Sequence, residues 1–116
     1  MKKFVTPGKM PTPYEAELLT IMMEECAEVI QRASKTLRFG IDEVEPGQKL
    51  DNTQRTSFEV GDLMAVFEKC SKAGLLDEDI IIAQIPIKME KLEKYMQRQA
   101  EFTLGESKLN GTDKLA

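Results

Sequence analysis

Histidine and tryptophan are absent from this sequence of 116 residues, and there are only two cysteines, Cys26 and Cys70. Without histidine the chain can build neither a Ser-His nor a Cys-His nucleophile, and it cannot supply the Glu-x-x-His pairs of di-iron helical bundles. A zinc site is also disfavoured, because zinc normally takes nitrogen or sulfur ligands in characteristic spacings. Both cysteines lie among apolar neighbours, so we expect them to be reduced core thiols.

Long apolar runs, a glycine-rich phosphate loop and an excess of basic charge are missing as well. No stretch is apolar enough to span a bilayer, and no secretory signal pattern follows the first residues. These absences predict a cytoplasmic protein without a membrane partner. The formal net charge of -4 argues against general binding to a nucleic acid polymer, because such proteins concentrate Lys and Arg. A nucleotide substrate remains compatible with this charge, since a bound metal can reverse the sign of a site.

The composition is that of an ordinary globular protein, with 41% hydrophobic and 31% charged residues. Residues 1–13 contain three prolines and a glycine, and are predicted to form an irregular N-terminal lead-in. Residues 14–103 are predicted to form one helical domain. Residues 104–116 are polar and are predicted to be a flexible tail.

Helical periodicity predicts where the first two helices lie. The first is expected to run from residue 12 or 13 to about residue 37 and to be closed by Gly40. The second is expected to start at Asp51 or Asn52, because a short oxygen-bearing side chain satisfies free backbone donors at a helix start. Gly74 is expected to end it.

A third helix is expected after Asp77, which can cap it, and to continue to about residue 100. Pro86 lies inside this stretch and lacks a backbone donor, so a kink or a restart is expected there. Residues 40–50 are acidic and contain Pro46 and Gly47, which favours a loop between the first and second helices.

Each predicted helix has a stripe of apolar residues with a spacing of three and four. The stripe of the first consists of Leu18, Met22, Cys26, Val29, Ala33 and Leu37. That of the second consists of Val60, Leu63, Val66, Phe67, Cys70 and Ala73, and that of the third of Ile81, Ile85, Met89, Leu92 and Met96. The predicted fold class is therefore all-α, a bundle of three main helices per chain. Further apolar residues on other sides predict a dimer or higher oligomer that buries them and completes the bundle.

Two acidic patterns interrupt these stripes: Glu-x-x-Glu at Glu25 and Glu28, and Glu-x-x-Asp at Glu59 and Asp62. At about 100° per residue, Glu25 falls inside the edge of the first stripe and Glu59 near the centre of the second. Acidic groups on an apolar face are costly unless a positive partner meets them. Because residues three apart share a helix face, two antiparallel helices would bring all four carboxylates to one place. Glu24 points further toward solvent.

All-oxygen ligation is the preference of hard cations, which makes Mg²⁺ the expected metal at these four carboxylates, with Mn²⁺ second. A metal-bound water is a nucleophile suited to phosphorus. The alternative is that the acids form a solvated face, since exposed carboxylates are the rule and a lone Glu-x-x-Glu carries little information. Two pairs on adjacent helices, with one acid of each pair facing inward, favour the metal site.

Seven other residues are candidates for binding a phosphorylated substrate, each with an equally plausible structural role. Cations at the end of the first helix also complement the helix dipole, Asn52 can be a cap, and Arg55 can be an ion-pair partner of the acids. The candidates are Lys35, Arg38, Phe39, Asn52, Arg55, Lys88 and Tyr95.

At these positions the chain resembles the MazG-like, all-α nucleoside triphosphate pyrophosphohydrolases, whose signature is E-E-x-x-E followed by E-x-x-D. The matching residues are Glu24, Glu25, Glu28, Glu59 and Asp62. The run EECAEVIQRASKTLRFG over residues 24–40 and the Asn52-x-x-Arg55 pattern before EVGDL resemble the small single-domain members, and the similarity covers roughly residues 15–98. The acidic segment 40–50 departs from the family pattern by making the separation between the two halves slightly long.

The resemblance implies a MazG-like helical bundle and hydrolysis between the α- and β-phosphates of a nucleoside triphosphate, which gives the monophosphate and pyrophosphate. It also implies Mg²⁺ at Glu25, Glu28, Glu59 and Asp62, and a homodimer or homotetramer with sites near subunit interfaces. Glu24 or Glu28 would help to deprotonate the attacking water, and the usual role of the family is to remove non-standard nucleotides. Two alternatives remain open: a phosphoribosyl-ATP pyrophosphatase, which shares the fold and the acidic clusters, and a non-catalytic helical interaction protein.

Overall fold

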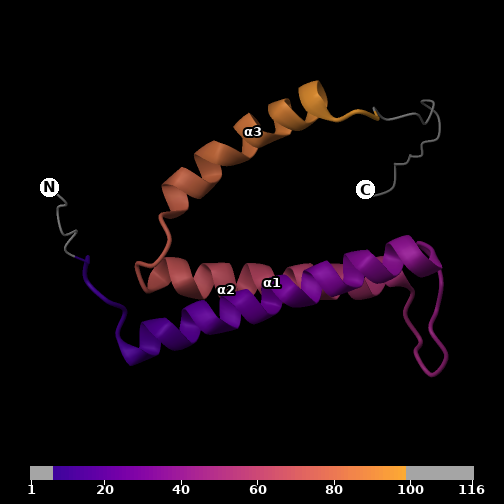
Figure 1. Ribbon diagram of the computed structural model, residues 1–116, viewed down its shortest axis with the longest axis horizontal. Coiled ribbons are helices and arrows are strands. Elements are labelled where there is room, and N and C mark those ends of the chain that lie inside the picture. The colour runs from indigo at the N-terminus through magenta and orange to yellow at the C-terminus, as the bar shows by residue number, and fades with distance from the viewer. Residues whose placement is uncertain (1–6, 99–116) are drawn as a thin grey trace, which may run out of the picture. The chain divides into compact units, whose positions relative to one another are not determined.

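The structure, a computed structural model, describes residues 7–98 and contains three α-helices and no strand within that range. They are α1 (Pro13–Phe39), α2 (Asn52–Lys72) and α3 (Glu78–Tyr95), labelled in Figure 1. The chain divides into two units after Glu78, so that α1 and α2 belong to the first and α3 makes up most of the described part of the second. The all-α prediction is confirmed.

A complete capping box fixes the start of α1. The Glu15 amide donates to Thr12 Oγ1 at 3.2 Å, and the Thr12 amide donates to Glu15 Oε1 at 2.9 Å. Pro13 occupies the first helical position, where its missing N–H costs nothing. The helix ends at Gly40, whose φ of 111° suits glycine alone, and its amide donates to the Thr36 carbonyl at 3.0 Å. The predicted boundaries are therefore confirmed to within two residues.

The loop between α1 and α2 contains a tight turn. Gln48 N–H donates to the Glu45 carbonyl at 2.9 Å, Pro46 takes the second turn position, and Gly47 takes the third with a φ of 87°. This is the pattern of a type II turn, which needs glycine at its third position. The predicted loop over residues 40–50 is confirmed.

Asp51, rather than Asn52, caps α2. The Gln54 amide donates to Asp51 Oδ1 at 2.8 Å and the Asp51 amide donates to Gln54 Oε1 at 2.9 Å, which makes a second capping box. Gly74 follows the C-cap residue with a φ of 81°, as a helix C-terminus requires.

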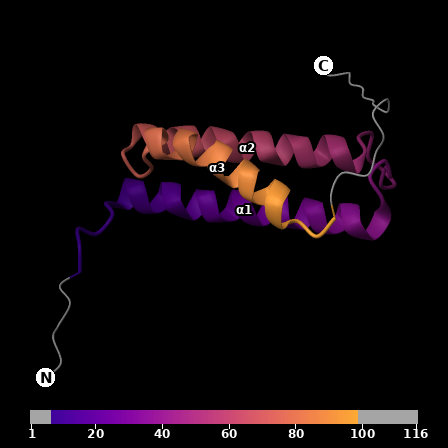
Figure 2. The same ribbon diagram turned by 90° about the horizontal axis from the view of Figure 1, so that it is seen from above.

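The two helices of the first unit form an antiparallel hairpin, and both ribbon views show them side by side (Figures 1 and 2). The buried apolar residues of the described chain are Leu18 and Cys70 alone. The buried polar residues are Arg32, which is 5% exposed, and Asn52, which is 1% exposed. The interior of the hairpin is thus polar toward the loop end.

The apolar stripe predicted for the first helix is wrong at its C-terminal end. Leu37 is 89% exposed and Ala33 is exposed, whereas Arg32 is buried and Thr36 half-buried. On α2, Val60 is also exposed. The face of α1 that meets α2 includes Arg32, whose Nη2 donates to Asn52 Oδ1 at the start of α2, while its buried Nε has no hydrogen-bond partner among the described residues.

In the second unit, α3 runs without interruption through Pro86, so the expected restart does not occur. The helix ends at Tyr95, earlier than the predicted residue 100, and the last backbone bond of the turn joins the Met96 amide to the Leu92 carbonyl at 3.0 Å. None of its residues is buried. Residues 99–103 of the predicted domain and the predicted tail over 104–116 lie outside the described residues, as do residues 1–6 of the lead-in.

None of the helices in residues 7–98 combines the length and the apolar character that crossing a bilayer demands.

Candidate functional site

Three of the four predicted metal ligands meet between α1 and α2. Glu25 on α1 and Glu59 and Asp62 on α2 each present a carboxylate oxygen, and these three oxygens lie within 4.8 Å of one another. The helical period explains this convergence, because Glu59 and Asp62 are three residues apart and face α1 together. Glu25 and Glu59 are half-buried and Asp62 is exposed, so the acid cluster opens to solvent on one side. We call Glu25, Glu59 and Asp62 the acid cluster below.

The charges of the acid cluster oppose one another. Partial burial of Glu25, and then the neighbouring carboxylates of Asp62 and Glu59, raise the pKa of Glu25 above its usual value. Converging carboxylates repel one another in this way unless a cation or a proton lies between them. An all-oxygen set of ligands at this spacing suits a hard divalent cation such as Mg²⁺ or Mn²⁺.

The other two acids of the E-E-x-x-E pattern lie beside the acid cluster. Glu24 and Glu28 are both exposed, and Glu28 is not one of the three residues whose oxygens converge. Their charges still contribute to the raised pKa of Glu25, after those of Asp62 and Glu59. The structure therefore brings together three predicted ligands and leaves Glu28 at the solvent side.

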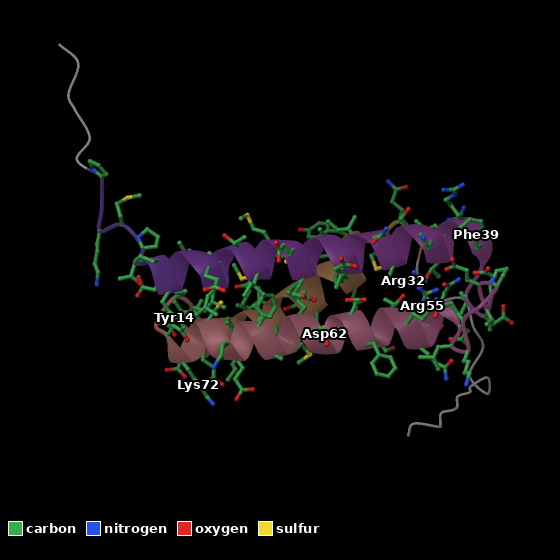
Figure 3. The ribbon with its side chains drawn as sticks, turned by 90° about the horizontal axis from the view of Figure 1, so that it is seen from below. Tyr14, Arg32, Phe39, Arg55, Asp62 and Lys72 are labelled. Carbon is green, nitrogen blue, oxygen red and sulfur yellow. The ribbon has the colours of Figure 1, made fainter. Side chains whose placement is uncertain are left out.

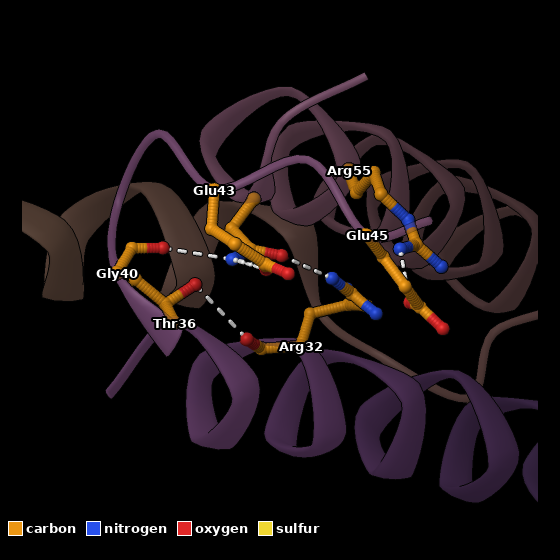
Figure 4. Close-up of polar contacts among 7 residues, drawn as sticks. Arg32, Thr36, Gly40, Glu43, Glu45 and Arg55 are labelled. Carbon is orange, nitrogen blue, oxygen red and sulfur yellow. Dashed lines mark hydrogen bonds and ion pairs between the residues drawn. The ribbon is translucent and has the colours of Figure 1, made fainter. Parts of the chain in front are cut away.

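A buried polar network ties the loop end of the hairpin together (Figure 4). Arg32 Nη2 on α1 donates to Asn52 Oδ1 on α2 at 2.6 Å. Asn52 Nδ2 in turn donates to the Gly40 carbonyl at 2.7 Å and to Glu43 Oε1 at 2.9 Å. Asn52 thus uses its amide oxygen and its amide nitrogen to join both helices and the loop. Its predicted role in substrate binding stays a prediction.

Arg55 has a partner in the loop rather than in the acid cluster. Its Nη1 lies 2.8 Å from Glu45 Oε1, and the two form an ion pair in which the Arg55 side chain is 23% exposed and the Glu45 side chain 46% exposed. The hydrogen bond from Arg55, and then the charge of Lys35, hold the pKa of the Glu45 carboxyl below its usual range. Glu45 is therefore a carboxylate, and an acceptor only, at neutral pH.

Beside this network the hairpin has a cavity of about 220 Å³. Two of its lining residues come from α1, three from the loop and one from the start of α2: Lys35, Phe39, Glu43, Glu45, Pro46 and Asn52. We call this cavity the loop pocket. It brings three of the predicted substrate-binding residues, Lys35, Phe39 and Asn52, to one place.

The acid cluster and the loop pocket succeed one another along the hairpin. Figure 3 shows Asp62 near the middle of α2, with Arg32, Arg55 and Phe39 toward the loop end. Ten residues separate Glu25 from Lys35 on α1, which is about 15 Å at the rise of an α-helix. Carboxylates, cations and an aromatic ring thus occur in that order.

The remaining candidates, Arg38, Lys88 and Tyr95, belong neither to the acid cluster nor to the lining of the loop pocket. Arg38 is exposed, and its guanidinium carbon lies 5.0 Å from the centre of the Phe39 ring, a cation–π distance. Lys88 and Tyr95 are exposed on α3 in the second unit, where the Lys94 ammonium lies 5.7 Å from the Tyr95 ring centre. Their predicted roles in substrate binding stay predictions.

Sequence reasoning missed Arg32, Glu43 and Glu45. Arg32 lies seven residues after Glu25, on the same side of the helix, and this spacing is a signal that could have indicated it. The sequence pattern marks Glu43 and Glu45 only as members of an acidic loop. Their partners lie nine and ten residues ahead in the chain, where no helical spacing relates them.

Comparison of the chain with models of known protein families, with curated proteins and with solved structures found no match in any of the three.

Proposed function

We propose that the chain is a magnesium-dependent nucleoside triphosphate pyrophosphohydrolase, which converts a nucleoside triphosphate and water to the monophosphate and pyrophosphate. The observation that carries the proposal is the convergence of Glu25, Glu59 and Asp62 to within 4.8 Å. The E-E-x-x-E and E-x-x-D patterns support it, through their resemblance to the MazG-like all-α enzymes. Removal of non-standard nucleotides is the biological role that this resemblance suggests.

Under this proposal the acid cluster, together with Glu28, holds Mg²⁺ or Mn²⁺. The raised pKa of Glu25 is consistent with the assignment, because partial burial, and after it the charges of Asp62 and Glu59, disfavour its ionised form unless a cation lies nearby. When bound, the metal neutralises the triphosphate and makes a water more acidic. Glu24 or Glu28, both exposed beside the cluster, accepts the proton of the attacking water.

The cations toward the loop end suit the phosphate chain of such a substrate. Lys35 and Arg38 lie beyond the acids on α1, in the direction of the loop, and Arg55 lies one turn from Glu59 on α2. Positive side chains on that side of the acid cluster attract the phosphates of a substrate whose reacting group is at the cluster. Lys88 and Tyr95, in the second unit, stay candidates for substrate binding on the sequence pattern alone.

We also propose that the protein is a homodimer or homotetramer with a MazG-like bundle shared between chains. The support is the small apolar core: Leu18 and Cys70 are the buried apolar residues of the described chain, while Ile30, Phe58 and Met64 of the hairpin are more than 60% exposed. A hairpin with so little buried apolar surface is marginal alone. Light scattering on the purified protein would show twice or four times the chain mass of 13.1 kDa, and a monomer would contradict this proposal.

The decisive experiment for the activity is a screen for magnesium-dependent pyrophosphate release. The panel contains standard and modified ribonucleoside and deoxyribonucleoside triphosphates, together with phosphoribosyl-ATP. Release from at least one triphosphate, lost in EDTA and restored by Mg²⁺ or Mn²⁺, is the expected result. Release from phosphoribosyl-ATP alone would favour the other enzyme class. No release from any compound, with no rise in melting temperature on adding Mg²⁺, would favour a non-catalytic interaction protein.

A further inference from the structure

The loop pocket has the size of a site for one ring system. Its volume of about 220 Å³ is below the roughly 300–1,000 Å³ of pockets that enclose drug-sized ligands. Phe39 supplies an aromatic face, and Glu43 and Glu45 supply two carboxylates from the loop. These walls suit a flat heterocycle that carries hydrogen-bond donors on its edge.

Both carboxylates are oriented by the helices. Glu43 Oε1 accepts from Asn52 Nδ2 at 2.9 Å, and Glu45 Oε1 accepts from Arg55 Nη1 at 2.8 Å. Each residue is thus held through one oxygen, and its second oxygen, Oε2, remains as an acceptor. The partner of Glu43 is a neutral amide, whereas that of Glu45 is a cation. Glu43 therefore keeps the larger negative charge and is the stronger acceptor for a ligand.

The charges around the loop pocket favour a neutral ligand edge over a cation. Lys35 lines the pocket, and Arg32 and Arg55 each contact one of its lining residues. These three positive charges, together with Arg38 beside the Phe39 ring, outnumber the two carboxylates of the pocket lining. A cationic group would meet this positive charge, whereas a neutral N–H donor would not.

We propose that the loop pocket binds the guanine base of a nucleoside triphosphate, with Glu43 accepting from the N1–H and 2-amino groups of the base and Phe39 stacking on its face. Guanine presents two adjacent donors on one edge, one for Oε2 of Glu43 and one for the second lone pair of Oε1, whose first lone pair accepts from Asn52 Nδ2. Adenine and cytosine place a ring acceptor beside their amino group, and uracil and thymine present carbonyl oxygens, so each brings an acceptor toward Glu43. The identity of the substrate as a triphosphate rests on the function proposed above.

The position of the pocket along the hairpin agrees with this assignment. The acid cluster, where the phosphates react under the proposed function, is about 15 Å from Lys35 along α1. An extended nucleoside triphosphate has this scale, so its base can lie in the loop pocket while its phosphates lie at the acids. Glu43 and Glu45 lie in the loop over residues 40–50, so the proposed base contact depends on the loop and not on the acid cluster.

The test compares base selectivity in the unaltered chain, in Glu43→Gln and in Asp42→Asn. Gln at position 43 keeps an acceptor for Asn52 Nδ2 but replaces the acceptor facing the base by a donor. Asp42 is exposed in the same loop and does not line the pocket, so its variant controls for the loss of one negative charge. Two quantities are measured: kcat/KM for GTP, dGTP, UTP and dUTP with Mg²⁺, and the Kd of guanosine and uridine monophosphates by calorimetry in EDTA.

We expect guanine to be preferred over uracil in both measurements, and the preference to fall by about 10- to 100-fold in Glu43→Gln, as the loss of a bidentate base contact predicts. Asp42→Asn should keep the preference.

The pocket assignment is wrong in two cases in which the triphosphates are hydrolysed. In the first, the uracil nucleotides are hydrolysed or bound as well as the guanine nucleotides, or better. In the second, Glu43→Gln shows the same preference for guanine as the unaltered chain. The proposed pyrophosphohydrolase activity stands in both cases. If nothing is hydrolysed but guanosine monophosphate still binds through Glu43, the pocket assignment stands and the proposed reaction fails. Equal or absent binding of both monophosphates, with no hydrolysis, overturns both.

Discussion

Arg32 and Asn52, twenty residues apart in sequence, make the shortest side-chain hydrogen bond of the described hairpin, at 2.6 Å from Nη2 to Oδ1. Both are buried, and the bond joins the last third of α1 to the first residue of α2. It replaces the apolar contact that two packed helices would normally make at this position. The pair also sets where the loop lies, because Asn52 binds the Gly40 carbonyl and Glu43 as well.

Asn52→Ala is expected to lower the free energy of unfolding by about 2–3 kcal/mol, because it leaves a buried guanidinium without its acceptor. Arg32→Met should lower the free energy of unfolding by less, since it removes the buried charge together with the hydrogen bond to Asn52. In a double-mutant cycle the two changes should couple by about 1 kcal/mol or more. Urea unfolding measures the stability of the two single variants and of the double variant. Lys49→Ala changes an exposed loop residue and is the control, and it should shift the free energy of unfolding by less than about 0.5 kcal/mol. If the free-energy changes of the two single variants simply add in the double variant, the Arg32–Asn52 hydrogen bond contributes no coupling energy to stability.

Glu59→Gln is expected to lower kcat/KM for the best triphosphate by about 100-fold or more while the helical circular dichroism stays unchanged. The same variant should lose most of the rise in melting temperature that Mg²⁺ or Mn²⁺ causes in the unaltered chain. Glu17→Gln changes an exposed acid on α1, outside the acid cluster, and is the matched control. Full activity in Glu59→Gln would show that the acid cluster is not the metal site.

The ion pair between Arg55 and Glu45 should make stability depend on pH. The pKa of Glu45 is lowered from its ordinary value of 4.5, chiefly by the hydrogen bond from Arg55. A carboxyl whose pKa is depressed by folding adds stability above its unfolded pKa and loses that stability as the pH falls through the folded pKa. The melting temperature of the unaltered chain should thus exceed that of Glu45→Gln at neutral pH, and the two should converge as the pH falls below 4.5. A difference that is constant over this range would contradict the ion pair.

Two glycines should respond to alanine with opposite signs. Gly47 has a φ of 87° in the loop turn, so Gly47→Ala should destabilise the protein by about 1 kcal/mol. Gly61 lies inside α2, where an added Cβ would meet nothing within 4 Å, so Gly61→Ala should stabilise it by up to about 1 kcal/mol. Thermal unfolding of the two variants in parallel measures the difference. If Gly47→Ala does not destabilise the protein, the turn does not hold Gly47 in the left-handed region; if Gly61→Ala destabilises it, the space beside Gly61 is not open.

The boundaries of α1 and α2 were predictable from the sequence because they depend on local chemistry. Thr12 with Glu15, and Asp51 with Gln54, form capping boxes within four residues of chain. Gly40 and Gly47 mark the positions where only glycine fits. The acids of the cluster were also predictable, since the helical period alone decides that Glu59 and Asp62 share a face.

The loop end of the hairpin was not predictable, because its structure depends on contacts between distant residues. The apolar pattern of the sequence predicted that Ala33 and Leu37 face α2. In the structure Arg32 is buried instead, so that a different side of α1 faces α2. Nothing in the local sequence indicates that Arg32 forms a hydrogen bond with Asn52, twenty residues later in the chain. The same is true of Glu43 and Glu45, whose partners lie on the far side of the turn.

Glu25 and Arg32 are seven residues apart on α1, and Asn52 and Glu59 are seven apart on α2. Deleting one residue within either interval would rotate the two ends of that helix by about 100° relative to each other. The acid cluster and the Arg32–Asn52 bond could then not face the opposite helix together. Insertions and deletions in related sequences should therefore be confined to the loop, whereas substitutions at exposed positions of these intervals other than Glu28 keep the register.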